Sequence, residues 1–162
     1  MKDFLEEEDQ EYFEREYSIP YEASEEAEDE GRNLQSSDSV DWRQSGAVTG
    51  IKNQGSCGGC YSFAAADAME GAHKIKSGSL VPMSTQQLLD CTNSYGNSGC
   101  MGGLMTNCYS YLRTSKIMTA PSYPYTGRQA ACRYNPSSGV VSTRGFTNLP
   151  RFDFNSLLNA VK

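Results

Sequence analysis

The sequence predicts one globular domain built mainly from helices and preceded by an acidic leader. The chain has 162 residues, of which 38% are apolar, and this is enough for a single domain with a sizeable core. Residues 1–30 hold 14 acidic and two basic residues, whereas residues 31–162 hold 6 acidic and 12 basic residues. Beyond the leader, apolar residues recur at helical spacing in several places. We therefore divide the chain into a leader, 1–36, and a body, 37–162.

The leader is nearly a polyanion from Glu6 to Glu30, a composition typical of a solvated and disordered segment. A second interpretation is that it docks on the basic body, because the two parts carry opposite net charges. The pI of 4.8 argues against a nucleic-acid binder. No apolar run reaches the roughly 18 residues of a membrane span, so we expect no integral membrane protein.

Two helices are predicted in the first half of the body. The first begins near Cys60, is rich in alanine, and ends at the Ser77-Gly78 turn. The second opens with Ser-Thr-Gln-Gln from Ser84 to Gln87, a capping-box pattern in which the serine accepts from a backbone N–H and the glutamine reaches back.

Two more helices are predicted toward the C-terminus. One carries four residues on a single face: Leu104, Cys108, Tyr111 and Leu112. The other has Asp153 as N-cap and then an apolar stripe of Phe154, Leu157, Leu158 and Val161. This stripe ends at Lys162 without a partner in the sequence, so we expect a chain that is a piece of a longer protein.

The cysteines admit several chemistries. There are six of them, at 57, 60, 91, 100, 108 and 132, and six cysteines allow fifteen full pairings, so spacing leaves the connectivity open. Cys57 and Cys60 form a C-x-x-C pair. A zinc site would need a second ligand pair at suitable spacing, and a redox dithiol would follow a strand instead of the polar turn found here. We expect no metal, and the dithiol oxidoreductase stays an alternative.

A nucleophilic thiolate is the third chemistry, and the residues favour it. Cys60 opens a predicted helix, where unpaired backbone N–H groups and the helix dipole stabilise an anion. Such a thiolate attacks carbonyl groups. The glycines before it allow a tight turn that leaves the sulfur exposed. Six residues upstream, Gln54 offers an amide that could donate to the oxyanion formed by the attack.

These residues also carry a family resemblance. Residues 54–63, QGSCGGCYSF, resemble the active-site segment of papain-like cysteine peptidases. Residues 39–43, SVDWR, are similar to the mature N-terminal region of that family, and 84–91 to its second helix. Residues 99–105, GCMGGLM, and 122–125, SYPY, are similar to cathepsin L-type members. The resemblance covers about residues 37–162 and implies an α+β, papain-like fold, here mainly its helical N-terminal half.

The resemblance implies roles for individual residues. Cys60 is the nucleophile, and the Gln54 side chain with the Cys60 backbone N–H forms the oxyanion hole. Gly102 and Gly103 hold an extended substrate backbone. The resemblance further assigns an apolar pocket to Leu104 and Met105, and two disulfides, Cys57–Cys100 and Cys91–Cys132. Cys108 is then a free thiol, which we expect to be a buried core residue.

The sequence departs from the family pattern in two places. Gly59 stands where Ser or Ala is usual, and we expect glycine to make the turn before Cys60 less rigid. Tyr61 replaces the commoner Trp. The chain also has one histidine, His73, thirteen residues after Cys60 in the same predicted helix, or roughly 20 Å along its axis. We expect His73 to be a surface residue, and the catalytic His and Asn to be absent from this chain.

The resulting expectation is a cysteine endopeptidase that lacks part of its catalytic machinery and is inactive alone. The stretch from Leu5 to Tyr17 resembles the end of an inhibitory propeptide, which would make the leader the enzyme's own inhibitor. We expect peptide or protein substrates, no cofactor and a monomer. Disulfides indicate the secretory route, hence a lysosomal or extracellular location, although no signal peptide is recognisable. The alternative is a protein that binds peptides or peptidases without hydrolysing them.

Overall fold

The structure is a computed structural model, and it describes residues 39–162. By its internal contacts the chain divides into two units, Met1–Ser39 and Val40–Lys162. The predicted leader, 1–36, lies outside the described residues, so the following concerns the second unit. None of the helices among residues 39–162 combines the length and the hydrophobicity that a membrane-spanning segment requires.

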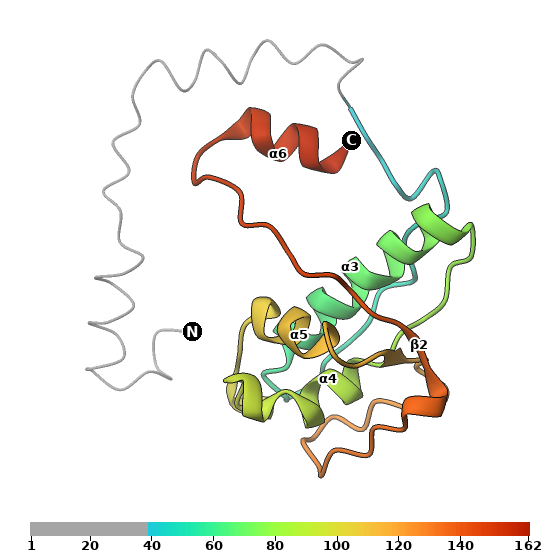
Figure 1. The fold of residues 1–162 in the computed structure, drawn as a ribbon, viewed down its shortest axis with the longest axis vertical. Coiled ribbons are helices and arrows are strands. Elements are labelled where there is room, and N and C mark those ends of the chain that lie inside the picture. The colour runs from blue at the N-terminus through green and yellow to red at the C-terminus, as the bar shows by residue number, and fades with distance from the viewer. Residues whose placement is uncertain (1–38) are drawn as a thin grey trace. The chain divides into compact units, whose positions relative to one another are not determined.

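The second unit is organised around its longest helix, α3, Cys60–Ser77. Two shorter helices, α4 (Thr85–Cys91) and α5 (Met105–Leu112), pack against α3 (Figure 1). The core lies between these three helices, because their apolar side chains are the most buried: Tyr61, Ala65, Leu88, Leu89 and Leu112 are at most 1% exposed. The predicted helix-rich architecture is confirmed.

The ends of α3 and α4 follow the local signals of the sequence. α3 ends at Gly78, whose φ of 77° is the left-handed conformation that glycine adopts most easily, and its N–H donates to the Lys74 carbonyl at 2.8 Å. The N-cap of α4 is Ser84, whose hydroxyl accepts from the Gln87 N–H at 2.9 Å. Both predicted boundaries are confirmed.

The return half of the capping box is absent, because tertiary contacts take the Gln87 side chain. Its amide nitrogen donates to the Tyr111 hydroxyl at 2.9 Å and to the Lys116 carbonyl at 3.0 Å. Its oxygen accepts from the Met118 N–H at 2.6 Å. The Ser84 N–H donates to the Met118 carbonyl instead. Gln87 therefore links α4 to α5 and to the strand that follows α5.

Regular strands are few in the described residues. β1 (Ile117–Met118) pairs antiparallel with β2 (Gly139–Val141), with Ile117 opposite Val141. Three short 3-10 helices complete the elements of this part: η4 (Asn93–Tyr95), η5 (Gly99–Met101) and η6 (Pro136–Ser138). One correction concerns Leu104, which was predicted on the face of a helix. It is the extended N-cap of α5, with φ −117° and ψ 142°.

The last helix, α6, spans Phe154–Val161, and its predicted N-cap is confirmed. The Asp153 carboxylate accepts from the Ser156 hydroxyl at 2.5 Å and from the Ser156 N–H at 2.9 Å, and these hydrogen bonds hold the pKa of Asp153 below its usual value. α6 buries none of its side chains within the described part. Its C-terminal turn is joined to the Trp42 indole, which donates to the Val161 carbonyl at 2.8 Å.

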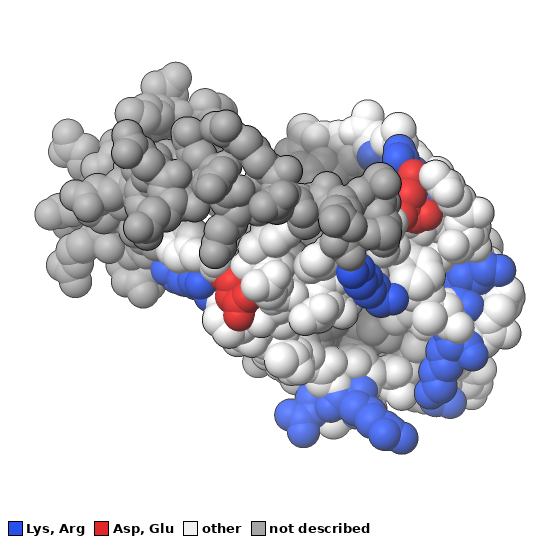
Figure 2. Space-filling view, turned by 90° about the horizontal axis from the view of Figure 1, so that it is seen from above, with Lys and Arg blue, Asp and Glu red and all other residues white. Residues whose placement is uncertain are grey.

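On the face of the described part that Figure 2 shows, basic side chains form more of the charged surface than acidic ones do. The five acidic residues among 39–162 are all engaged: Asp41 pairs with Arg43, Asp67 and Glu70 with Lys52, Asp90 is buried, and Asp153 caps α6. Lysines and arginines are more numerous than these acids. The excess positive charge expected from the sequence is therefore carried at the surface of this part.

Candidate active site

Cys60 is the first residue of α3, and its side chain is exposed. The N-cap is Gly59, whose carbonyl accepts from the N–H of Ser62 at 2.9 Å and from its hydroxyl at 2.7 Å. The thiol thus lies at the end of the helix where backbone N–H groups have no intrahelical acceptor and where the dipole favours an anion.

The two glycines before Cys60 are constrained differently. A Cβ on Gly58 would lie 2.6 Å from the Cys100 carbonyl oxygen, which accepts from the Gly58 N–H at 3.0 Å. Only glycine allows this approach of two backbones. Gly59 has φ −93°, and a Cβ there would lie 3.2 Å from Leu89 Cδ1. Position 59 can therefore nearly accommodate a small side chain.

Gln54 and Cys60 line the same cavity, which has a volume of about 420 Å³. The Gln54 backbone is held there from a distant part of the chain, since its carbonyl accepts from the Tyr125 hydroxyl at 2.8 Å. The Tyr125 ring packs edge-on against Phe63 of α3, with the centroids 4.9 Å apart. Tyr125 entered the sequence analysis only within a family motif, and its link to Gln54 was missed because 71 residues separate the two.

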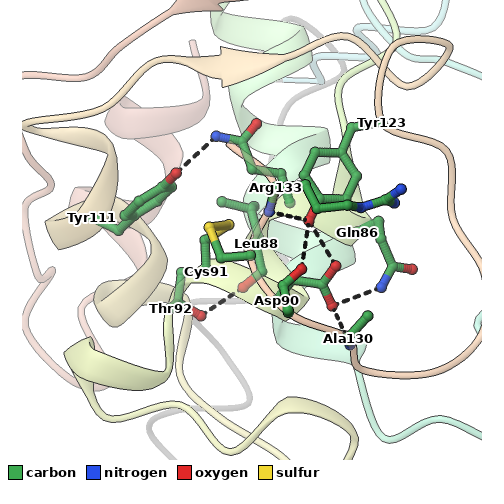
Figure 3. Close-up of a disulfide and its surroundings, with 12 residues drawn as sticks. Gln86, Leu88, Asp90, Cys91, Thr92, Tyr111, Tyr123, Ala130 and Arg133 are labelled. Carbon is green, nitrogen blue, oxygen red and sulfur yellow. Dashed lines mark hydrogen bonds between the residues drawn. A yellow bond between two sulfur atoms is a disulfide. The ribbon is translucent and has the colours of Figure 1, made fainter. Parts of the chain in front are cut away.

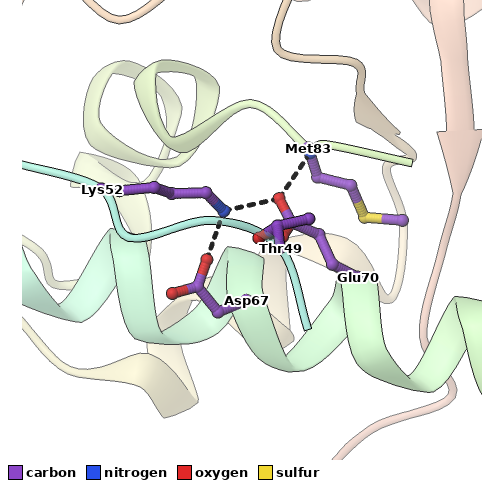
Figure 4. A network of polar contacts seen from close by, with 5 residues as sticks. All are labelled: Thr49, Lys52, Asp67, Glu70 and Met83. Atoms are coloured by element: carbon purple, nitrogen blue, oxygen red, sulfur yellow. Dashed lines mark hydrogen bonds and ion pairs between the residues drawn. The ribbon is translucent and has the colours of Figure 1, made fainter. Parts of the chain in front are cut away.

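The segment leading to Gln54 is fixed on α3 by a polar network (Figure 4). Glu70 is 1% exposed, and its carboxylate accepts from Lys52 Nζ at 2.7 Å, from the Thr49 hydroxyl at 2.5 Å and from the Met83 N–H at 2.7 Å. Lys52 also donates to Asp67. Burial lowers the pKa of Lys52, but the hydrogen bonds to the two carboxylates outweigh it and raise that pKa. No sequence pattern indicated a role for these residues, because the contacts join segments that are distant along the chain.

The predicted substrate-binding residues lie around the start of α5. Gly102 has φ 118°, in the region that favours glycine, and Gly103 is exposed. Leu104 and Met105 are 56% and 44% exposed, so both present apolar surface. This segment follows η5, which is tied to the start of α3 because the Tyr61 hydroxyl donates to the Gly99 carbonyl at 3.1 Å.

Two disulfides and two free cysteines account for the six cysteines. Cys57 is bonded to Cys100, and Cys91 to Cys132. The first bond joins the turn before Cys60 to η5. Cys108, the second free cysteine besides Cys60, is 0% exposed in the core, and burial raises the pKa of its thiol to about 12.

The second disulfide lies beside a buried carboxylate (Figure 3). Asp90 accepts from the Gln86 amide at 2.9 Å, from the Ala130 N–H at 2.7 Å and from the Tyr123 hydroxyl at 2.8 Å. The same hydroxyl accepts from the Arg133 N–H at 3.0 Å. The Asp90 cluster therefore fixes the irregular segment around Cys132 against α4.

His73 does not approach Cys60. It lies in α3, thirteen residues after Cys60, which corresponds to roughly 20 Å along a helix. Its side chain is partly exposed. The single histidine of the sequence therefore cannot exchange a proton with the Cys60 thiol.

Comparison with known proteins decides the family. Residues 36–162 match the family described as papain family cysteine protease. The chain belongs to the papain family of cysteine proteases. It is 46% identical over 124 residues to cathepsin L1 of Drosophila melanogaster, covering 76% of this chain and 33% of that protein. It is 44% identical over 126 residues to cathepsin S of Rattus norvegicus, covering 76% and 38% of the two chains.

Solved structures agree with this assignment. The digestive procathepsin L 3 of Tenebrio molitor larval midgut superposes with a TM-score of 0.74 at 42% identity, covering 80% of this chain and 42% of that chain. The Carica candamarcensis cysteine protease CMS1MS2 superposes with a TM-score of 0.68 at 40% identity, over 75% and 56% of the chains. The papain-like fold and the cathepsin L-type resemblance are thereby confirmed. The chain spans about a third of the length of the curated relatives it matches.

Proposed function

We propose that Cys60 is the nucleophile of a cysteine endopeptidase. The observation that carries this proposal is an exposed thiol at the N-terminus of α3, in the cavity that Gln54 also lines. The sulfur attacks the scissile carbonyl carbon, and the Gln54 amide and the Cys60 N–H donate to the resulting oxyanion. The carbon–nitrogen bond then breaks, the amine leaves with a proton, and water hydrolyses the remaining thioester.

Substrate recognition is proposed for the segment before α5. Gly102 and Gly103 would bind the backbone of an extended peptide, because no side chain there blocks its approach. The exposed side chains of Leu104 and Met105 favour an apolar residue at P2, the second position before the scissile bond.

The proton for the leaving amine must come from outside these 162 residues. A thiol peptidase needs an imidazole to form the thiolate and to protonate the amine. His73 is the single histidine of the sequence and is roughly 20 Å from Cys60 along α3. We therefore propose that the 162-residue chain does not hydrolyse peptides at an enzymatic rate without a histidine and an asparagine supplied by further sequence.

The leader is proposed to be a propeptide remnant that inhibits the same enzyme. Its net charge is opposite to that of the body, and a procathepsin L is among the similar structures. The two disulfides suit an oxidising compartment, so we propose a lysosomal or extracellular location for a monomeric enzyme.

Affinity labelling of the full chain tests the nucleophile. We expect a biotinylated N-blocked dipeptidyl chloromethyl ketone with leucine at P2 to label Cys60, identified by peptide mapping, and a glutamate at P2 to slow the reaction. Cys60→Ser should abolish labelling. Label on Cys108, or equal labelling of the chain in urea, would overturn the assignment. A fluorogenic peptide should stay intact, and its turnover by the wild type but not by Cys60→Ser would contradict the need for an external imidazole.

The chain's distant histidine also favours a second function, the binding of peptides without hydrolysis. The labelling experiment separates the two, because a binding protein would show peptide affinity with no preference of the reagent for Cys60. A dithiol oxidoreductase would need a Cys57–Cys60 disulfide, and Cys57 is bonded to Cys100 instead.

A further inference from the structure

Asn97 is a buried polar residue in the loop between η4 and η5, and its amide takes no part in the proposed reaction. Only 3% of the Asn97 surface is exposed to solvent. A buried amide is costly unless its donors and acceptors are paired. In the described part, no buried side-chain nitrogen or oxygen lacks a partner, so this amide is fully engaged.

The partners of Asn97 come from three different segments. Its Oδ1 accepts from the Leu104 backbone N–H at 2.8 Å and from the Asn107 amide at 3.1 Å. Its Nδ2 donates to the Thr92 hydroxyl at 2.9 Å and to the Cys108 sulfur at 3.4 Å. The amide therefore joins the segment before α5 to the end of α4 and to the core.

The backbone at Gly103 is shaped around this amide. A Cβ on Gly103 would lie 2.4 Å from Asn97 Oδ1, so the glycine backbone rests directly against the amide. The loop is closed on its other side because the Ser98 N–H donates to the Gly102 carbonyl at 2.9 Å. Among residues 39–162 the Gly103 N–H donates no hydrogen bond, and Gly103 is exposed.

We infer that Asn97 is a positioning residue for peptide binding: it holds Gly102–Leu104 in the conformation that presents the Gly103 backbone to an extended substrate. This inference rests on the proposed function of that segment. The hydrogen bond from Leu104 to Oδ1 sets the direction of the Gly103–Leu104 peptide unit. The exposed Gly103 N–H remains available to a peptide carbonyl, and Leu104 keeps its apolar side chain at the surface.

The test compares two reagents that alkylate Cys60 in the full chain. One is an N-blocked dipeptidyl chloromethyl ketone with leucine at P2, and the other is 2-chloroacetamide, which carries no peptide. The readout is the ratio of their second-order rate constants, measured by peptide mapping at Cys60. Asn97→Ala should lower this ratio about tenfold, the equivalent of one lost backbone hydrogen bond to the peptide, and should leave the chloroacetamide rate unchanged.

The matched control is Thr92→Val, which removes a partner of the same amide on the side away from Gly103. We expect it to lower the unfolding temperature and to keep the ratio within threefold of the wild type. Asn97→Asp retains the oxygen that faces Leu104 but replaces the donor to Thr92, whose hydroxyl proton is given to the Leu88 carbonyl, so it should restore part of the ratio while lowering the unfolding temperature. If Asn97→Ala does not fold, Asn97→Ser, whose side chain is too short to reach Leu104, is measured in its place.

The outcomes separate this inference from the proposed function. A third reagent, the same chloromethyl ketone with D-leucine at P2, tests whether the wild type recognises the peptide. If the wild type reacts faster with the L-leucine than with the D-leucine reagent, and Asn97→Ala leaves the ratio to chloroacetamide unchanged, only the role of Asn97 is overturned. A wild type that does not distinguish the L- and D-leucine reagents would overturn both. If Thr92→Val lowers the ratio of rate constants as much as Asn97→Ala does, Asn97 only stabilises the fold, and this result would also contradict the inference.

Discussion

Alanine at each of the two glycines before Cys60 should have clearly different effects on stability. In Gly58→Ala the new Cβ would lie 2.6 Å from the Cys100 carbonyl oxygen, and that residue is held in place by the Cys57–Cys100 disulfide. Relieving the overlap separates the two backbones and breaks the hydrogen bond from Gly58 to Cys100. Overpacking costs about 1–3 kcal/mol and a lost hydrogen bond about 1 kcal/mol, so we expect a loss of about 2–4 kcal/mol.

In Gly59→Ala the same methyl group meets Leu89 Cδ1 at 3.2 Å, the movable end of a side chain. The φ of −93° is open to alanine. Restricting the unfolded chain stabilises by about 0.4–1 kcal/mol, whereas alanine is a poorer N-cap than glycine by a similar amount. We expect a net change within about 1 kcal/mol.

Thermal unfolding of the full oxidised chain, followed by circular dichroism, measures both changes. At about 3 °C per kcal/mol for a domain of this size, Gly58→Ala should unfold roughly 6–12 °C below the wild type, and Gly59→Ala within about 3 °C of it. Equal shifts in the two variants, or a neutral Gly58→Ala, would refute the reasoning. A small effect at 59 would also mean that glycine there is not needed for the turn, as the Ser or Ala of the family suggests.

Three further results are expected. Burial raises the pKa of Cys108 to about 12, so its neutral thiol contributes stability that is present below pH 9 and is lost as the pH rises toward 12. At pH 9, iodoacetamide should modify Cys60 in the native chain and reach Cys108 only in urea. Rapid labelling of both cysteines in the native chain would contradict the burial of Cys108. Tyr125→Phe removes the donor to the Gln54 carbonyl and keeps the ring, so the unfolding free energy in urea should fall by about 1 kcal/mol, and an unchanged midpoint would mean that this bond contributes nothing. Glu70→Gln removes the charge of a buried carboxylate that accepts from Lys52, Thr49 and Met83, and should destabilise by about 2–4 kcal/mol; equal unfolding temperatures of the variant and the wild type would disprove this cost.

Local signals were sufficient for the end of α3 and for the starts of α4 and α6, but not for the start of α5. Gly78 ends α3 and Ser84 starts α4 because each acts on backbone groups within four residues, which a sequence pattern records directly. Asp153 does the same for α6. The position of Cys60 at the start of α3 followed from the same kind of reasoning, so the candidate nucleophile could be chosen from the sequence.

Contacts between distant segments were decided only by the tertiary structure. The Gln87 side chain fits a capping box by spacing, yet it bonds to α5 and β1, since buried donors and acceptors must be paired wherever partners lie. Tyr125 reaches Gln54 across 71 residues, and Asn97 reaches Leu104 around a turn. The sequence by itself predicted Cys60 as the candidate nucleophile and located the end of α3 and the starts of α4 and α6. Only the folded chain determined how those residues are held, because packing brings together groups that no local spacing relates.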